Sequence, residues 1–556
     1  MAKTYVFAIG GTGARVMRSL TMLMASGLPG FDHTTEICPI IIDYDLDNGD
    51  KSRAINSMNK YCKVREYISK GNDANDGFFS GKIVKLPFVD NFQWRFGVDD
   101  DTTQTFSEYI GYRKLDMVTP STQELVGSLY DASNDAEYTE LEINMKVGFQ
   151  GNPNIGSVVF NKLKEDNEFR EFVTHFNPDD DKVVVLGSLF GGTGASGIPE
   201  LITAMHNPDA EDKLKKANIA AIMVLPYFVV SRSDNEDISV KSVIFNSKTK
   251  AALNYYEKSG LNALINRIYY VGDKFATVVR PHLGAVNQKN AAHPVEMIAA
   301  MAIADFASSK TAIEKKDYRV ASKNFYKFGA GADIVDGITF NNFVGKYEEN
   351  SFVRDVMHNM IGFSFIMKYF YDEIVNNGTS KRFDHVQYYK EMKLNEFSNK
   401  KLNSMPETPN ALQDFCAALY SFYCMELSEN IPNDDGYMQW IKEMHLRDGY
   451  HGKHALKFFN FNCKDIKDFV QECPLYKEEK SFMSRTTTKR TLIDYKETFD
   501  SCLNNALTDR KHFEAGKGVV GNLEKYPWVL IDIMKICSEE LRKFTPELEE
   551  KFKSLP

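Results

Sequence analysis

Cysteine is scarce in this sequence, and the few cysteines do not form a motif. Eight of them are scattered along 556 residues without a CxxC pair, and the histidines do not cluster at the spacing of a metal site. These absences argue against a zinc-binding or disulfide-stapled domain. We therefore expect reduced thiols and a cytoplasmic protein.

Long apolar runs and an excess of basic charge are lacking as well. The most apolar stretch, residues 291–307, contains Glu296 and Asp305 and is shorter than the roughly 20 residues that cross a membrane. The apolar run at residues 5–9 is too short for a signal peptide. The net charge of −9 gives no general attraction for nucleic acid. We expect a soluble protein with no membrane span and no general nucleic-acid binding.

The first half of the chain does contain strand patterns that alternate with helical ones. Apolar residues recur at helical spacing over residues 14–24, between two strand-like runs. Such alternation predicts an α/β fold with a parallel sheet covered on both faces. The strand-like runs are residues 5–9, 37–42, 182–187, 219–225 and 267–271.

The length and the later sequence patterns predict more than one domain. A chain of 556 residues exceeds what one hydrophobic core usually organises. We predict an α/β domain at residues 1–285 with a polar insertion at about 50–145, a central helix at 286–310, and a mainly helical second domain at 311–556. Long helical patterns in that last domain cover residues 352–376, 411–430 and 526–543.

The first chemical motif is the turn that follows the first strand. Gly10, Gly11, Thr12 and Gly13 lead directly into a helical pattern. Backbone amides without side chains in the way make a helix N-terminus a site for anions. Glycines also serve tight turns, so this loop alone leaves both explanations open.

A second loop of the same kind lies far downstream and supports the interpretation of these loops as an anion-binding site. It comprises Gly191, Gly192, Thr193, Gly194 and Ala195, after the strand-like run at 182–187. Two amide-rich helix N-termini at one edge of a sheet suit a chain of phosphates better than a single carboxylate. Neither loop is followed by GK[ST], which argues against a Walker-A site.

A dinucleotide-binding site is the main alternative. Gly11 and Gly13 fit the first two positions of GxGxxG, and Asp43 ends the second strand as a ribose-binding acid would. The third glycine position is Val16, however, and the second glycine loop is not explained by that motif. We therefore favour a polyphosphate site shared by two loops.

The loops together resemble those of the tubulin and FtsZ family. The segment GGTGASGIP at residues 191–199 is similar to the family's signature GGGTGxG, although Phe190 and Ser196 replace its flanking glycines. Asn152, within GNPNIG, matches the loop that faces the terminal phosphate. The run IDYD at residues 42–45 resembles the second loop, and PYF at residues 226–228 the fifth. The resemblance covers roughly residues 4–310.

This resemblance implies a GTP/GDP site with Mg²⁺. Asn287 and Asn290, before the central helix, match the position of the asparagine that reads guanine, with Asn290 favoured; either could instead be a helix N-cap. Asp43 and Asp45 lie where the family's second loop approaches the phosphates, and Asp45 is the implied Mg²⁺ contact unless it is a solvated loop acid. His293 is expected to pack or to cap.

The resemblance also implies hydrolysis completed by an acid of the neighbouring subunit. GADIVD at residues 331–336 offers Asp336, with Asp333 as the second candidate; a second match, directly after it at residues 337–342, ends in Asn342 and would give slow or no turnover. The expected protein is a GTPase that assembles head to tail with itself, with a possible protein partner on the helical domain. The alternative is a nucleotide-gated switch or scaffold that does not form filaments.

Overall fold

The computed structural model describes the first half of the chain and short segments of the second. The described residues are 2–309, with gaps at 29–30, 32–33, 46, 70–77, 96–104, 119, 131–138, 208–209, 231–244, 273–276 and 280–287, then 325–329, parts of 422–443, 476–480 and 488–492. The chain divides into two compact units. Unit 1 is Met1–Leu20, Thr34–Ile55 and Ile83–Gly331; unit 2 is Thr21–His33, Asn56–Lys82 and Ala332–Pro556.

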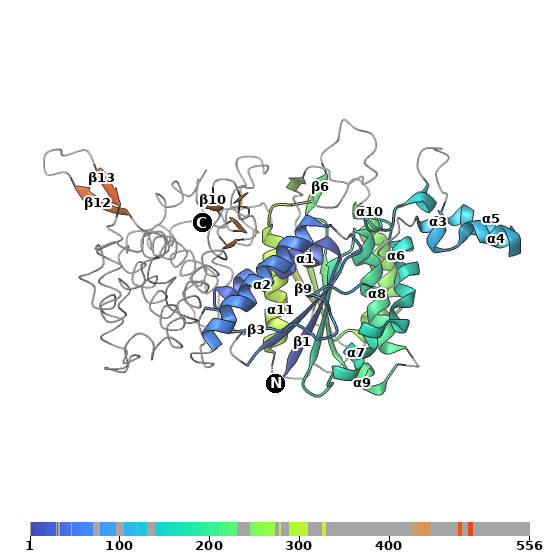
Figure 1. Ribbon diagram of the computed structural model, residues 1–556, viewed down its shortest axis with the longest axis horizontal. Helices are drawn as coiled ribbons and strands as arrows, with labels where there is room; N and C mark the ends of the chain where they lie inside the picture. Colours follow the sequence, from blue (N-terminus) through green and yellow to red (C-terminus); the bar gives the residue numbers. More distant parts are fainter. Residues whose placement is uncertain are drawn as a thin grey trace, which may run out of the picture. The chain divides into compact units, whose positions relative to one another are not determined.

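Unit 1 is built around a seven-stranded sheet in the order β3-β2-β1-β4-β5-β7-β9 (Figure 1). Every recorded strand pair from β2 to β9 is parallel. The predicted α/β class with a parallel sheet is therefore confirmed. The strands are β1 Lys3–Ile9, β2 Glu36–Ile42, β3 Lys82–Ile83, β4 Lys182–Ser188, β5 Asn218–Val224, β7 Arg267–Gly272 and β9 Phe325–Gly329.

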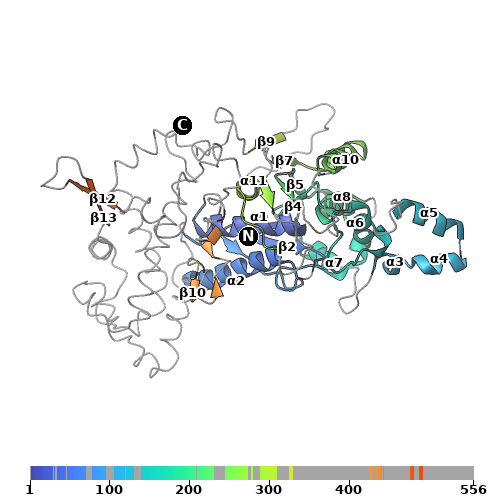
Figure 2. The same ribbon diagram turned by 90° about the horizontal axis from the view of Figure 1, so that it is seen from above.

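Helices cover both faces of this sheet, as Figures 1 and 2 show. Helices α1 (Gly10–Ala25) and α11 (Pro294–Ser308) lie on one face, and α6 (Pro153–Phe160), α7 (Asn167–His175) and α8 (Gly192–His206) on the other. The strands are buried on both sides, so they read as continuous apolar runs rather than as alternating ones. Tyr5, Phe7 and Ile9 of β1 share one core with α6, α7 and α8.

Most sequence predictions of elements agree with the structure, but the central helix predicted at 286–310 is shorter: α11 runs from Pro294 to Ser308, and residues 288–293 are not helical. The five predicted strands coincide with β1, β2, β4, β5 and β7 within two residues. The range 50–145, predicted as an insertion, contains most of α2 (Gly49–Ser69) and the edge strand β3. The other elements there are α3 Phe106–Tyr109, α4 Tyr112–Val118, α5 Pro120–Tyr130 and the 3₁₀ turn Glu140–Glu142.

The remaining elements of unit 1 connect the sheet to its surroundings. Helix α10 (Phe245–Lys258) packs near the 3₁₀ turn Leu261–Leu264, and the short strands β6 (Phe228–Val230) and β8 (Thr277–Val279) pair in parallel outside the main sheet. Two further short elements are the 3₁₀ helix Asn161–Glu165 and α9 (Asp212–Lys215).

In unit 2, aromatic packing and two short hairpins are described. Phe79 packs edge-on against Phe422 with ring centroids 5.2 Å apart. Within the predicted helix 411–430, Glu426–Ser428 forms strand β10, which pairs with β11 (Ile431–Pro432), so that prediction extends too far. Strands β12 (Tyr476–Lys480) and β13 (Thr488–Leu492) form the other hairpin. The predicted helices at 352–376 and 526–543 lie outside the described residues.

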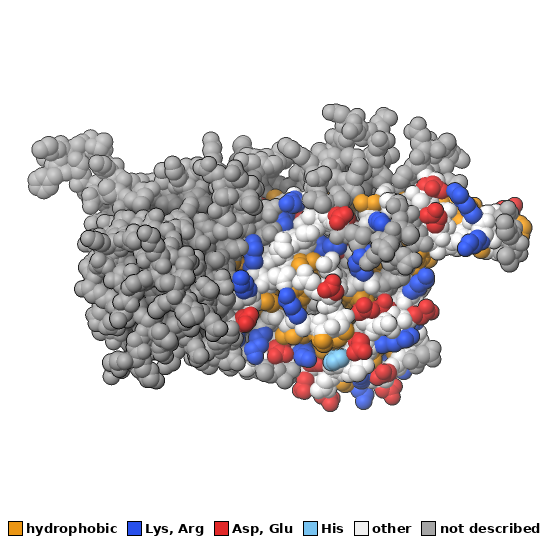
Figure 3. Space-filling view, viewed as in Figure 1, with side chains coloured by type: hydrophobic (Ala, Val, Ile, Leu, Met, Phe, Trp, Pro, Cys, Tyr) orange, Lys and Arg blue, Asp and Glu red, His pale blue; other side chains and the backbone are white. Residues whose placement is uncertain are grey.

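The described surface is mixed in charge. On the face of unit 1 in Figure 3, lysine and arginine side chains are interspersed with aspartate and glutamate. Among the described residues, none of the helices combines the length and the apolar character needed to span a membrane.

Candidate functional site

The candidate site lies where the strand order reverses. β1 and β4 are neighbours in the centre of the sheet, while β2 lies beyond β1 and β5 lies beyond β4. Ile9 pairs in register with Gly187, so these two strands reach the same carboxyl edge together. In open α/β sheets, ligands bind outside the carboxyl ends of the strands at such a switch point.

The two glycine loops meet at this point. Helix α1 begins at Gly10, and a β-carbon on Gly10 would lie 3.4 Å from Cβ of Thr193 and 3.6 Å from the backbone N of Gly194. Helix α8 begins at Gly192 with Gly191 as its N-cap, and no side chain caps it. Two helix N-termini therefore lie side by side, and the backbone amides that a helix start leaves without intrahelical partners make such a place a site for anions.

Two glycines of these loops are explained by packing rather than by a ligand. A β-carbon on Gly13 would lie 2.6 Å from the carbonyl carbon of Ala8, and one on Gly194 would lie 2.6 Å from the carbonyl oxygen of Ser188. Each helix thus passes directly over the strand that precedes it, which a larger residue would prevent. The chain-turning explanation holds for these two glycines, while Gly10, Gly11 and Gly192 face other loops.

A third loop closes one side of the site. A β-carbon on Gly192 would lie 3.0 Å from the backbone N of Asn152 and 3.2 Å from that of Gly151. The predicted proximity of Asn152 to the second glycine loop is therefore present, through the backbone. Lys248 of α10 donates to the carbonyl oxygen of Gly151. Burial lowers the pKa of Lys248, because the favourable charge of Glu140 does not make up for the hydration that the ammonium group loses.

Asp43 follows β2 and contributes a buried carboxylate with one free oxygen. Its Oδ1 accepts a hydrogen bond from the backbone N of Asp45 at 3.2 Å, but Oδ2 is buried without a partner. Burial, reinforced by the charge of Asp45 and opposed by Lys51, raises the pKa of Asp43 to about 7. A buried carboxylate oxygen without a donor is costly, so it marks a place where a ligand can supply one.

Asp45 lies deeper in the loop than the sequence suggested. It is 5% exposed and forms a bridge with Val147, and the ammonium of Lys51 donates to its carbonyl oxygen at 2.6 Å. The described residues hold no group of three or more His, Cys, Asp or Glu side chains that could bind a metal. Mg²⁺ commonly takes one or two carboxylates plus phosphate oxygens, and Asp43 and Asp45 would fit that smaller requirement.

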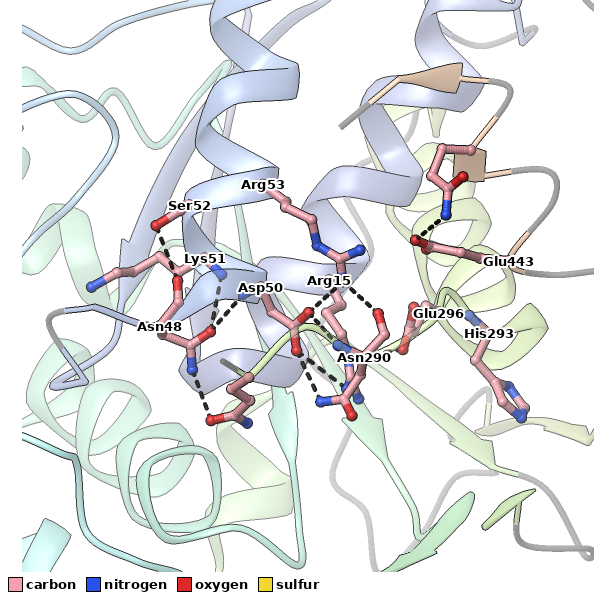
Figure 4. A network of polar contacts seen from close by, with 12 residues as sticks. Arg15, Asn48, Asp50, Lys51, Ser52, Arg53, Asn290, His293, Glu296 and Glu443 are labelled. Atoms are coloured by element: carbon pink, nitrogen blue, oxygen red, sulfur yellow. Dashed lines mark hydrogen bonds and ion pairs between the residues drawn. The ribbon is translucent and has the colours of Figure 1, made fainter. Parts of the chain in front are cut away.

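Asn290 is held by the start of α2 (Figure 4). Its Nδ2 donates to Oδ2 of Asp50 and its backbone N to Oδ1 of Asp50, each at 3.0 Å. Its carbonyl oxygen accepts a hydrogen bond from Arg53, which also pairs with Asp50 at 2.6 Å. Asn290 thus has a structural role beside α2, and its reading of guanine stays a prediction.

Arg15 of α1 is buried beside Asp50 and connects the contact between Asn290 and Asp50 to α1 and α11. The Nε of Arg15 lies 2.9 Å from Oε1 of Glu296, and the hydroxyl of Tyr227 donates to the same oxygen at 2.8 Å. Burial acts to lower the pKa of Arg15, but Tyr227 and the carboxylates of Glu296 and Asp50 raise it above its usual value. The starts of α1, α2 and α11 are therefore tied together around the site.

Sequence reasoning missed this network, and it treated His293 correctly. Arg15, Asp50 and Glu296 each lie in the first turn or two of a helix next to the glycine loop, which is the signal that would have found them. His293 is fully buried, and its Nδ1 accepts from the backbone N of Val295 at 3.0 Å. It caps α11, as expected.

The other predicted site residues lie outside the described part of the chain. These are the possible base reader Asn287 and the two candidate catalytic acids, Asp333 and Asp336.

Comparison with known proteins does not assign the sequence to a family. No protein-family model matches the sequence, and no curated protein matches it significantly. The functional argument therefore rests on the geometry above and on the resemblance of the loops.

Proposed function

We propose that this protein binds a guanine nucleotide at the carboxyl edge of its sheet and is a GTPase of the tubulin and FtsZ kind. The observation that carries the proposal is the meeting of the α1 and α8 N-termini at Gly10 and Thr193. Their orphan amides would hold the phosphates, and Asp43 beside them has a buried oxygen in need of a donor.

A chain of phosphates suits this edge better than one small anion. Two helix N-termini supply partial positive charge over a wider area than one, and the hydroxyl of Thr193 adds a donor. The loop at Gly151 and Asn152 extends the site beyond α8, and Lys248 holds a positive charge against that loop. A triphosphate would use all three features.

The guanine base, the Mg²⁺ ion and the hydrolysis are proposed from the resemblance of the loops to those of the tubulin and FtsZ family. Guanine would be read by Asn290 or Asn287, and Mg²⁺ would be held through Asp45 and the phosphates. Hydrolysis would be phosphoryl transfer to water, driven by positioning and electrostatics. The acid that positions the water, Asp336 or Asp333, would come from the next subunit, so turnover would require head-to-tail assembly.

Nucleotide identity is the first test. Chromatography of nucleotide released from the purified protein should give GDP or GTP, and calorimetry with Mg²⁺ should show tighter binding of GTP than of ATP. Equal affinity for the two would remove the argument for a base-reading asparagine. Released NAD would overturn the proposal in favour of a dinucleotide site, which shares the strand order and the acid after β2.

A non-polymerising nucleotide switch is the second candidate. It is favoured by the buried network that ties Arg15, Asp50 and Glu296, because such a network could pass a change at the site to α11. The GTPase rate per subunit separates the two. It should rise with protein concentration and level off as filaments sediment; a constant rate from a monomer would favour the switch. Asp336→Ala should slow hydrolysis by orders of magnitude while filaments still form.

A further inference from the structure

The first turns of α8 have a sequence that forms helix poorly, although they carry amides of the proposed site. They contain Gly192, Gly194 and Gly197, and glycine is among the least favourable residues inside a helix. The hydroxyl of Ser196 donates back to the carbonyl oxygen of Gly192 at 2.8 Å, a bond that tends to bend a helix. The N-terminal end of α8 therefore depends on support from outside the helix.

Pro199 removes one more internal bond from the same stretch. It lies inside α8, and a proline has no backbone N–H to donate to the carbonyl oxygen four residues earlier. That carbonyl belongs to Ala195, in the first turn of the helix. The sequence of α8 thus leaves the carbonyl oxygen of Ala195 without its intrahelical donor.

Tyr256 of α10 supplies the missing donor. Its hydroxyl donates to the carbonyl oxygen of Ala195 at 2.8 Å, and the residue is only 1% exposed. Burial raises the pKa of Tyr256 well above its usual value, so the hydroxyl keeps the proton that it donates. The bond joins residues that are 61 positions apart and replaces the one that Pro199 cannot make.

Helix α10 also contacts the loops on either side of this turn. The ring of Phe245 packs against Phe190, in the loop that precedes α8, with ring centroids 5.0 Å apart. Lys248 donates to the carbonyl oxygen of Gly151 in the third loop. Because α10 is held at these two other points, the hydroxyl of Tyr256 is a fixed anchor for the start of α8.

The carbonyl of Ala195 is coupled to the amides at the start of α8. It belongs to the same planar peptide group as the N–H of Ser196. In an α-helix that N–H donates to the carbonyl oxygen four residues earlier, which is that of Gly192. A donor that fixes the Ala195 carbonyl therefore also fixes the turn whose first amides lack intrahelical partners and would hold the phosphates.

We propose that Tyr256 is a positioning residue for the phosphate-binding turn of α8, which it holds through the Ala195 carbonyl that Pro199 leaves free. The inference rests on the proposed function, because it concerns the amides that would bind the phosphates. Tyr256 itself would not contact the nucleotide.

Removal of one hydroxyl tests this role. Calorimetry with Mg²⁺ should show that Tyr256→Phe binds inorganic tripolyphosphate and GTP more weakly by roughly tenfold, a loss of the size seen when a supporting partner is removed at a metal site. Tyr255→Phe removes a hydroxyl from the neighbouring position of α10, which is 54% exposed, and should change neither affinity. A lower thermal midpoint in Tyr256→Phe at unchanged affinity would show that the bond serves stability alone and would overturn the inference.

Pro199→Ala tests the route through Ala195. Alanine restores a backbone N–H that can donate to the Ala195 carbonyl, so this variant should bind with the affinity of the wild type. In that background Tyr256→Phe should cost less than about twofold, because coupled residues are not additive. An equal loss in both backgrounds would overturn the inference, since Tyr256 would then act by another route.

The outcomes separate this inference from the proposed function. Tripolyphosphate binding that weakens in Tyr256→Phe and is restored by Pro199→Ala would support the inference even if GTP and ATP bound equally, a result that would remove the base-reading asparagine from the proposed function. Tripolyphosphate binding that does not respond to Tyr256→Phe would overturn the inference and leave the phosphate site standing. No binding of nucleotide or tripolyphosphate by the wild type would overturn both.

Discussion

The two edges of the central sheet differ in how their polar groups are satisfied. At the amino edge, Lys182 of β4 donates to the carbonyl oxygens of Phe306 and Ala307 at 3.0 and 2.9 Å, which caps the C-terminus of α11. Arg267 of β7 pairs there with Asp305 at 2.8 Å. These long side chains reach protein partners as soon as the sheet and helices form.

The carboxyl edge is left incomplete by folding. Asp43 keeps an oxygen without a donor, the NH₂ of Gln288 has no acceptor among the described residues, and the ammonium of Lys248 rests on a neutral carbonyl. Buried polar groups are normally paired. One amide oxygen at the amino edge, Oδ1 of Asn218, is also without a partner. The two edges therefore differ in their ionisable groups: those of the amino edge contact protein partners, whereas Asp43 at the carboxyl edge keeps a carboxyl oxygen that a ligand could satisfy.

The cost at the carboxyl edge should be measurable as a pH dependence at Asp43. Its pKa is raised to about 7 in the folded protein, so the folded state holds a proton that the unfolded chain releases above about pH 4. Stability from this group is therefore lost as the pH rises from about 4 to 7. Asp43→Asn should remove that loss and be more stable above pH 7 by up to about 4 kcal/mol.

Urea unfolding at several pH values, without nucleotide, checks this prediction. Besides burial, the charges of Asp45 and Asp50 raise the pKa of Asp43, while the charge of Lys51 and the hydrogen bond from the backbone N of Asp45 lower it. Wild type and variant should converge near pH 4 and diverge toward pH 7. A variant that is less stable than the wild type at pH 8 would show that the carboxylate is compensated and that the two edges do not differ in this way.

Gly11→Leu should separate binding from folding at the carboxyl edge. A β-carbon there makes only ordinary contacts, the closest at 3.4 Å, so a β-carbon is accommodated, and replacing glycine in the first turn favours the helix by up to about 1 kcal/mol. It would fill the space where the nucleotide approaches α1, and affinity should fall by roughly a hundredfold, about 3 kcal/mol. Calorimetry and thermal unfolding measure the two effects.

Gly192 is a poorer position for the same test. A β-carbon there would lie 2.9 Å from Cβ of Phe149 and close to the backbone of Asn152, so a lost affinity would not distinguish a blocked site from a displaced loop. Gly11→Ala serves instead as the graded control, with a smaller loss of affinity. Normal binding by Gly11→Leu would exclude α1 from the site.

The sequence predicted the elements of the site better than the contacts between them. The strands were recognisable because a parallel sheet buries both faces and leaves apolar runs, and both glycine loops follow such runs directly. Their meeting at Gly10 and Thr193 follows from the neighbouring positions of β1 and β4. An acid after β2 was equally visible as Asp43.

Contacts between distant parts of the chain could not be predicted in this way. The sequence offers Asn290 as a free amide, but its partner Asp50 is 240 residues away and was assigned to an insertion. The boundary error has a physical cause. Helix α2 begins with polar residues that bond to the loop before α11, so its first turns lack the apolar stripe that identifies a helix.

Lys182→Met should show the smallest effect and should act on stability alone. The methionine keeps the apolar stem but removes the Lys182 donor from the carbonyl of Ala307, while the carbonyl of Phe306 still accepts from Ser309. Losing the donor to Ala307 costs about 1–3 kcal/mol. Part of that cost is offset because burial already lowers the pKa of Lys182 and thus disfavours its charged form. A net loss of about 1–2 kcal/mol in urea unfolding is expected, with unchanged nucleotide affinity because the change lies at the opposite edge. Lys216→Met, at an exposed position of the same unit, is the matched control and should change neither quantity. A weakened nucleotide affinity in Lys182→Met, at intact stability, would contradict the division of roles between the two edges.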